Sequence, residues 1–282
     1  MEASIIIPTY NGGELLRKTL QAIYAQQTNK AYEVVIIDSG SRPDTIAIIN
    51  EFPVKLLEIP NSTFNHGLTR DQAAAAASGK VLIFINQDAE PGDRNWLEQM
   101  VEPFNQDENL LAVQGGIRER LDMHRFFWDS CGETFYFTSE SKNWISRFHN
   151  MGFSTVNAAI RRSAWQQHPF GKMSIFEDKG FQRQVHHQGN EIVYGEGWVY
   201  HTHDYTYKQL KKRCQDEGYG WRLVGESYPL IDCIRDALVL KNYTKLLRGI
   251  RDRKVTKWSE IAFPFMRPFW VYKGNHFNRG LL

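Results

Sequence analysis

The sequence predicts an α/β fold, with a mostly parallel, Rossmann-like sheet flanked by helices and a helical C-terminal extension. Short apolar runs that are typical of buried strands alternate with segments whose apolar residues recur at helical spacing. This alternation favours right-handed crossovers between parallel strands. Polar residues follow three of the expected strands, and open α/β sheets bind their ligands at that edge.

The first half of the chain contains most of these elements. Ile5, Ile6 and Ile7 form an apolar run that ends at Pro8, and Leu16 and Leu20 belong to the first helical pattern. In chain order we expect strands over 4–7, 33–37, 54–59, 81–85 and 111–116, with helical segments over about 15–27, 46–52 and 68–77 between them.

The strand over 81–85 organises the candidate site. Its five apolar residues fit a strand buried on both faces, and the chain then continues Asn86-Gln87-Asp88. A carboxylate at this place is suited to a metal ion or a substrate. The same Asp88 is equally suited to open the turn before Pro91, so both interpretations stay open at this point.

Two other strand ends carry polar groups, Thr9-Tyr10-Asn11 and Asp38-Ser39. The carboxyl edge of a parallel sheet would gather all three into one crevice, where a nucleotide could lie. Asp38 is suited to accept hydrogen bonds from a base or a ribose, and its alternative role is to cap the turn at Gly40. Neither Gly-x-Gly-x-x-Gly nor a P-loop motif is present, which removes the main support for a dehydrogenase or an ATPase.

Composition limits the class of protein. The 282 residues are 42% hydrophobic and 23% charged, as in soluble globular proteins, and the net charge of +2 gives no support to nucleic-acid binding. Three cysteines, an odd number without metal-like spacing, favour a reducing compartment. The chain shows no cleavable leader and no apolar run of about 18 residues. We therefore expect a cytoplasmic protein.

Four motifs occur in order along the chain: Ile-Ile-Pro-Thr-Tyr-Asn at 6–11, Ile-Asp-Ser-Gly-Ser at 37–41, Asn-Gln-Asp-Ala at 86–89 and Glu-Asp at 177–178. Together they resemble glycosyltransferase family 2, whose members are inverting enzymes with a GT-A fold. The segment Phe-Asn-His-Gly-Leu-Thr-Arg at 64–70 resembles the rhamnosyltransferase-like branch. The resemblance extends from about residue 4 to about residue 220, so we expect a GT-A domain over 1–220 and a basic, aromatic helical extension over 221–282.

The resemblance implies a set of donor-binding residues. The residues implied are Pro8, Thr9, Tyr10, Asn11, Asp38, Arg70, Gln87, Asp88 and Asn157. In this set Thr9, Tyr10 and Asp38 hold the nucleotide, and Asn157 contacts a sugar hydroxyl. Arg70 lies near the start of the alanine-rich helix, where a guanidinium suits a diphosphate. A solvated surface arginine is the alternative.

The resemblance also implies a divalent cation, Mg²⁺ or Mn²⁺. The family motif is Asp-x-Asp, whereas this chain has Asn86-Gln87-Asp88, so Asp88 alone carries the charge. One carboxylate with phosphate oxygens and water can hold Mg²⁺. His201 matches the family's later histidine ligand, with His203 as its substitute, and alternate positions of a strand would place both on one face. Buried, hydrogen-bonded histidines are the alternative.

Glu177 and Asp178 open an expected helix, and the resemblance makes this pair catalytic, with Asp178 as the general base. Inversion at the anomeric carbon is one displacement, so the acceptor hydroxyl must lose its proton to a carboxylate. The alternative is that two acids only stabilise a helix N-terminus.

Two further segments are distinctive. Residues 122–150 are rich in Phe, Trp and Tyr, which suits either stacking on sugar rings or internal packing. The segment 241–257 holds seven Lys and Arg residues against Asp252 alone and precedes an aromatic stretch. This adjacency fits peripheral contact with anionic lipid at the cytoplasmic membrane face, or a solvated basic helix beside a packed tail.

Together these features predict an inverting, metal-assisted hexosyltransferase. We expect the donor to be a dTDP- or UDP-linked deoxyhexose with L-rhamnose as the sugar, and the acceptor to be a glycan or lipid-linked glycan. One alternative is an inactive GT-A-like glycan- or partner-binding domain, favoured by the missing first Asp at position 86. The other is a sugar nucleotidyltransferase, which requires a basic glycine-rich loop after the first strand. Here no Lys or Arg occurs there before Arg17.

Overall fold

The computed structural model describes residues 1–120, 122–123, 126–128, 138–148, 151–186 and 192–277. The chain forms two compact units. The sheet unit comprises Met1–Arg118 and Phe153–His201, and the helical unit comprises Glu119–Gly152 and Thr202–Leu282. The domain boundary expected after residue 220 stays a prediction.

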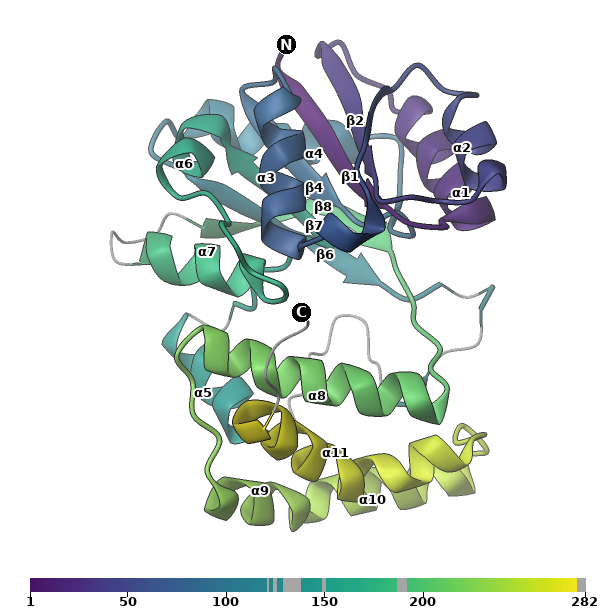
Figure 1. The fold of residues 1–282 in the computed structure, drawn as a ribbon, viewed down its shortest axis with the longest axis vertical. Helices are drawn as coiled ribbons and strands as arrows, with labels where there is room; N and C mark the ends of the chain where they lie inside the picture. Colours follow the sequence, from purple (N-terminus) through teal and green to yellow (C-terminus); the bar gives the residue numbers. More distant parts are fainter. Residues whose placement is uncertain (121, 124–125, 129–137, 149–150, 187–191, 278–282) are drawn as a thin grey trace. The chain divides into compact units, whose positions relative to one another are not determined.

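The sheet unit alternates strands and helices in its first half (Figure 1). These elements are β1 (Ala3–Thr9), α1 (Gly13–Tyr24), β2 (Tyr32–Asp38), α2 (Pro43–Ile49), β3 (Lys55–Glu58), the 3₁₀ turn η1 (Asn61–Thr63), α3 (His66–Ala76) and β4 (Val81–Ile85). The remaining elements of this unit are β5 (Glu90–Pro91), α4 (Trp96–Gln106), β6 (Ala112–Arg118), β7 (Asn157–Arg161), α6 (Arg162–Gln167), α7 (Glu177–Val185) and β8 (Ile192–Tyr200).

The eight strands form one sheet in the order β3-β2-β1-β4-β7-β6-β8-β5. The first four strands are parallel to one another, as the sequence predicts, and four of the seven pairings that the structure describes are parallel. β7 pairs antiparallel with both β4 and β6, so the second half of the sheet is mixed. The register Thr9↔Asp38 brings the ends of β1 and β2 together.

The two faces of the sheet are covered by different helices. Ile5 and Ile7 point into one core, which α1 and α4 complete with Leu20 and Met100. Ile6 points to the opposite face and packs in a core that α3, α6 and α7 complete. The alternation of side chains along β1 therefore supplies both cores, which explains why its apolar run is uninterrupted.

The helical unit contains α5 (Ser139–Arg147), α8 (Tyr207–Leu223), α9 (Leu230–Ala237), α10 (Leu240–Arg251) and α11 (Trp258–Phe277). α8 and α11 run side by side (Figure 1). Gly218 and Gly274 allow this close packing, because a Cβ at either would lie about 2 Å from a carbonyl oxygen of the facing helix. Pro264 and Pro268 lie inside α11, which continues through both.

Part of the aromatic segment 122–150 packs internally. Phe126, Phe127, Trp128 and Trp144 are buried within the helical unit, and Phe126 and Trp128 contact Phe263 of α11. The aromatic residues at 135–137 lie outside the described residues. Among the helices that the structure describes, none is both long and apolar enough to cross a membrane.

Candidate functional site

The ends of β1 and β2 form the first part of the site. Asp38 is 1% exposed, and its Oδ2 accepts hydrogen bonds from the backbone amides of Gly40 at 2.9 Å and Ser41 at 2.8 Å. Its buried Oδ1 has no hydrogen-bond partner among the described residues, and neither has the buried hydroxyl of Thr9. Asp38 therefore caps the turn with one oxygen and keeps the other available as an acceptor. The two roles considered for it are compatible.

Gln87 joins the end of β4 to the end of β1. Its Oε1 accepts from the Tyr10 backbone amide at 3.0 Å, and its Nε2 donates to the Tyr10 carbonyl at 3.2 Å. Asn11 has a left-handed φ of 50°, and its amide donates to the Ser41 hydroxyl at 2.7 Å. Strand ends that are distant in the sequence are thus held together, and the Tyr10 side chain is left half exposed.

The Phe-Asn-His-Gly segment shapes the start of α3. The Asn65 side chain caps the helix by accepting from the Leu68 amide at 3.1 Å. Gly67 allows close approach, since a Cβ there would lie 2.2 Å from the Gly171 carbonyl oxygen. α3 begins at His66, earlier than expected, so Arg70 lies beyond the first turn rather than within it.

Arg70 is buried, with 5% of its side chain exposed, so it is not a solvated surface arginine. Its Nη1 lies 3.2 Å from Glu177 Oε1 and 3.3 Å from His66 Nδ1, and its Nη2 donates to Asn86 Oδ1 at 3.3 Å. One guanidinium therefore joins the loop after β4 to the acid pair of α7. Its predicted contact with a diphosphate stays a prediction.

The two acids at the start of α7 differ in their surroundings. Burial alone would raise the pKa of the Glu177 carboxyl, but Arg70, His66 and the Thr155 hydroxyl at 3.0 Å outweigh it and lower that pKa. For Asp178, burial raises the pKa and the neighbouring Glu177 adds to the effect, while Lys179 opposes it. Glu177 is held as an anion by fixed partners, whereas Asp178 is the acid with the greater proton affinity.

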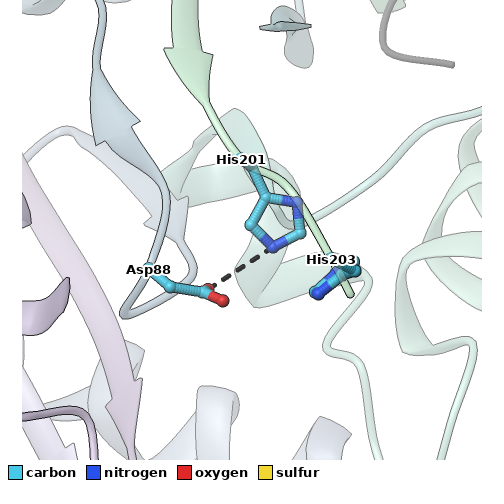
Figure 2. Close-up of side chains that lie close together, drawn as sticks. All are labelled: Asp88, His201 and His203. Atoms are coloured by element: carbon cyan, nitrogen blue, oxygen red, sulfur yellow. Dashed lines mark ion pairs between the residues drawn. The ribbon is translucent and has the colours of Figure 1, made fainter. Parts of the chain in front are cut away.

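Asp88, His201 and His203 form the described cluster that could hold a metal ion (Figure 2). Their ligand atoms all lie within 4.8 Å of one another, and His201 Nε2 is 3.4 Å from Asp88 Oδ1. Figure 2 shows the His201 ring directed at the Asp88 carboxylate with His203 beside them. Asp88 lies within a turn rather than opening one, because the Ala89 amide donates to the Asn86 carbonyl at 3.1 Å and closes the turn over 86–89.

The expected placement of both histidines on a strand is wrong. β8 ends at Tyr200, opposite Arg118, the last residue of its partner β6. One further bond, from the His201 amide to the Arg118 carbonyl at 2.8 Å, extends the pairing, and the chain then leaves the sheet. The two histidines nevertheless lie near the same carboxylate.

The donor set suits a divalent cation. Ligand atoms about 2.1 Å from a cation lie at most about 4.2 Å apart, so small side-chain rotations would close the cluster around one. Mg²⁺ prefers oxygen ligands throughout, whereas imidazole suits transition metals. One carboxylate with two imidazoles therefore fits a first-row transition-metal ion better than Mg²⁺.

Asn157, the predicted sugar contact, lies at the start of β7 and is fully buried. Its Nδ2 donates to the carbonyls of Gly116 at 2.9 Å and Gly197 at 3.2 Å, and its Oδ1 accepts from Trp96 at 3.1 Å. These contacts give Asn157 a structural role where β6, β7 and β8 meet. A contact with the donor sugar stays a prediction.

Sequence reasoning missed four members of the site, namely His66, Asn86, Thr155 and Lys179. His66 and Asn86 lie inside the quoted motifs, but their pairing with Arg70 depends on folding. Thr155 and Lys179 flank the acid pair in space, and Lys179 Nζ donates to the Phe153 carbonyl while lying 3.5 Å from Asp178 Oδ2. A cation next to two acids in the sequence was the available signal for Lys179.

Comparison with solved structures confirms the fold. The chain resembles glucosyl-3-phosphoglycerate synthase from Mycobacterium tuberculosis, solved with Mn²⁺, UDP and glucosyl-3-phosphoglycerate, with a TM-score of 0.64 at 15% identity over 80% of this chain and 81% of that one. It also resembles the mannosyltransferase PcManGT from Pyrobaculum calidifontis, solved with GDP-Man and Mn²⁺, with a TM-score of 0.62 at 16% identity over 99% and 88% of the two chains. Both are GT-A glycosyltransferases, so the predicted fold class is confirmed.

Comparison with known sequences identifies the family. The chain is 31% identical to the O-antigen chain rhamnosyltransferase WbaN of Salmonella anatum, over 76% of this chain and 70% of that protein. It is 29% identical to the O-antigen chain rhamnosyltransferase RfbN of Salmonella typhimurium, over 77% and 72%. The family model described as glycosyl transferase family 2 matches residues 4–168. The resemblance inferred from the motifs is therefore confirmed: the chain belongs to glycosyl transferase family 2.

Proposed function

We propose that this family 2 glycosyltransferase moves a deoxyhexose, with L-rhamnose expected, from a dTDP- or UDP-linked donor to a glycan or lipid-linked glycan, with inversion and with help from a divalent cation. The observation that carries the proposal is the position of Arg70, which contacts Asn86 at 3.3 Å and Glu177 at 3.2 Å. This bridge supports a single site that contains both the loop of Asp88 and the acid pair.

Asp178 is the better candidate for the general base. Glu177 is held by Arg70 and Thr155, and its lowered pKa makes it a weak proton acceptor. The raised pKa of Asp178, caused first by burial, increases its affinity for a proton. In the proposed step the acceptor oxygen bonds to the anomeric carbon, its proton passes to Asp178, and the bond to the nucleoside diphosphate breaks.

Asp88, His201 and His203 would hold the cation. When bound, the cation would neutralise charge on the departing diphosphate. The buried Asp38 Oδ1 and the Thr9 hydroxyl, each without a partner among the described residues, would bind the nucleotide, with Oδ1 accepting from a base N–H or a ribose hydroxyl. The half-exposed Tyr10 ring would contact the nucleotide from the same edge.

The proposed sugar and acceptor follow from the sequence relatives, whose names describe rhamnosyltransferases of the O-antigen chain. A cytoplasmic enzyme at the membrane surface fits an acceptor carried on a lipid. The alternative of an inactive glycan-binding domain is favoured by Asn86, which replaces the first acid of the family motif and contacts Arg70 instead of adding charge to the metal cluster.

The test is a transfer assay with dTDP-rhamnose, UDP-rhamnose and GDP-sugars, each with Mn²⁺, with Mg²⁺ and with EDTA. Thermal shift in the same mixtures reports binding of donor. We expect a preferred donor, turnover that EDTA abolishes, and higher activity with Mn²⁺ than with Mg²⁺. Donor binding without any turnover or donor hydrolysis would favour the inactive domain.

Asp88→Ala isolates the metal cluster. We expect this variant to lose its response to Mn²⁺ and most of its turnover, because the remaining ligands are two neutral imidazoles. Asp93→Ala is a matched control on an aspartate that accepts from the nearby Asn95 amide. If Asp88→Ala keeps both its activity and its metal response, the cation is bound elsewhere.

A further inference from the structure

The helix α9 exposes its apolar side chains. Leu230, Ile231 and Ile234 lie within an arc of about 100° of this helix, Leu238 follows its last residue, and all four are between 48% and 68% exposed. The buried side of the same helix carries Asp236, whose carboxylate accepts from the Tyr228 hydroxyl at 2.9 Å. A helix with its apolar stripe outward and an acid inward requires another apolar phase to cover it.

The helix α10 also exposes apolar side chains, and basic residues lie beside them. Leu240, Leu247 and Ile250 are 77%, 66% and 46% exposed and share one side of the helix. Lys241 and Arg248 are also exposed and lie along the flank of this stripe. An amphipathic helix with a basic flank is typical of segments that lie in the interface of a lipid bilayer.

Contacts within the helical unit connect these stripes to α11. The Tyr243 hydroxyl donates to the carbonyl of Ala237 at the end of α9, and the Tyr243 ring lies 4.9 Å from that of Phe265. Phe265, Phe269 and Trp258 of α11 are 53%, 53% and 72% exposed. We call the exposed apolar residues of α9 and α10 named above, with these three aromatics, the apolar face.

The charges beside the apolar face indicate what covers it. Between residues 241 and 257 the chain carries seven Lys and Arg residues and one acid, Asp252. Two copies of such a face would bring like charges together, whereas anionic headgroups would neutralise them. Tryptophan, as at position 258, is favoured at the boundary between water and lipid. The charge pattern therefore favours an anionic bilayer over a second copy of the chain.

We propose that the apolar face of α9, α10 and α11 binds the surface of a lipid bilayer rich in anionic headgroups. The apolar side chains enter the acyl boundary, and Lys241 and Arg248 lie at headgroup level. This inference adds to the proposed function the surface that contacts the membrane and the kind of lipid it binds. It rests on the proposed function only for the use of a lipid-linked acceptor.

The test is sedimentation of the full chain with vesicles of phosphatidylcholine alone or with one quarter phosphatidylglycerol, at low and high salt. We expect binding to the anionic vesicles that weakens as salt rises. Ile231→Glu with Leu247→Glu should lower the partition coefficient at least about tenfold. Lys241→Glu with Arg248→Glu should lower it about tenfold or more on anionic vesicles. Leu223→Glu, on a 40% exposed leucine of α8, is the control and should bind as the parent does.

Three results would overturn the proposal. The first is no sedimentation of the parent chain with anionic vesicles at low salt, and the second is equal binding to both vesicle types. The third is a dimer in light scattering that Ile231→Glu with Leu247→Glu dissociates, because the face would then join two copies. None of these measurements uses a donor, and transfer to a water-soluble acceptor is assayed separately, so this inference and the proposed function can fail independently.

Discussion

Glu177 in the sheet unit and Glu140 in the helical unit are both buried, and their carboxyls are in opposite protonation states. In the sheet unit, Glu177 is 4% exposed, and Arg70 at 3.2 Å helps to lower its pKa against the effect of burial. In the helical unit, Glu140 is 2% exposed, and burial raises its pKa to about 8. The charge of Arg267 lowers this pKa, whereas Glu217, to which Arg267 Nη2 donates at 2.5 Å, raises it.

The opposite protonation states of Glu177 and Glu140 follow from the groups that replace water around each carboxyl. A buried carboxylate keeps its charge only if a cation and hydrogen-bond donors replace the lost water. The sheet unit supplies Arg70 and Thr155 to Glu177, as expected where charge takes part in chemistry. The helical unit leaves Glu140 protonated at neutral pH, as part of a packed interior. If the contrast is correct, changes to the acids of the sheet unit affect turnover most, and changes to Glu140 affect stability alone.

Asp178→Asn should have the largest effect. We expect turnover to fall at least about 10²-fold, because the amide cannot accept the proton of the acceptor hydroxyl. Nucleotide binding should persist, because Asp38 and Thr9 lie at the ends of other strands. Transfer rate and nucleotide thermal shift measure the two properties separately.

The matched control for this substitution is Asp44→Asn, on an exposed aspartate in the first turn of α2. It makes the same chemical change at a helix start and should leave turnover unchanged. Unchanged turnover in Asp178→Asn would falsify the assignment of the base. It would also contradict the expectation that changes to the acids of the sheet unit affect turnover most.

Arg70→Met should be the next largest change. It leaves Glu177 buried without its cation, which costs about 3–5 kcal/mol of unfolding free energy at pH 7. Glu177 has a lowered pKa in the folded state, so its stabilising contribution is present above about pH 4.5 and is lost as pH falls through the folded pKa. The difference in unfolding free energy between the parent and Arg70→Met should therefore become smaller at acidic pH. Urea unfolding at several pH values measures it.

A double-mutant cycle gives the control. Adding Glu177→Gln to Arg70→Met removes the uncompensated charge and should recover a large part of the loss. If the two single losses simply add, the pair is not coupled and Arg70 is held by its other contacts.

The first half of the fold was predictable because local pattern and tertiary structure agree there. Residues 34–37 and 81–85 are buried on both faces of the sheet, and strands of this kind have uninterrupted apolar runs. The mixed half was not predictable, because β7 follows the segment 119–152, which belongs to the other unit. No local sequence pattern predicts that the strand Asn157–Arg161 lies antiparallel between β4 and β6.

The candidate site divides in the same way. Asp38 is the last residue of β2 and Asp88 follows the end of β4 at Ile85, so the topology alone predicts their edge of the sheet. The burial of Arg70 could not be predicted, since its partner Glu177 is far along the chain. The exposed stripe of α9 was also missed, because apolar residues at helical spacing predict a buried side and do not reveal which side packs.

Glu140→Gln should change stability without changing turnover. The folded pKa of Glu140 is about 8 against about 4.5 in the unfolded chain, so its contribution is fully present below pH 4.5 and is lost as pH rises through 8. The variant should therefore gain up to a few kcal/mol relative to the parent between pH 5 and pH 9. Thermal unfolding across this range measures the gain, and Glu226→Gln makes the same substitution on the glutamate paired with Arg147, as a comparison. If the stability difference between the parent and Glu140→Gln did not change with pH, Glu140 would be charged in both the folded and the unfolded chain.

Lys179→Gln should have the smallest effect and tests how the state of Asp178 is set. Lys179 lowers the pKa of Asp178 against the raising effect of burial, so its removal should raise that pKa further. Because the base must be deprotonated to act, the acidic limb of the kcat profile should move to higher pH by about one unit or less. Turnover at the plateau should be nearly unchanged. Lys179→Arg keeps the charge and should keep the parent profile, which separates the electrostatic effect from the loss of the bond to the Phe153 carbonyl. No shift in Lys179→Gln would show that the Lys179 charge does not set the proton affinity of Asp178. A shift equal in both variants would assign the effect to the lost bond with the Phe153 carbonyl.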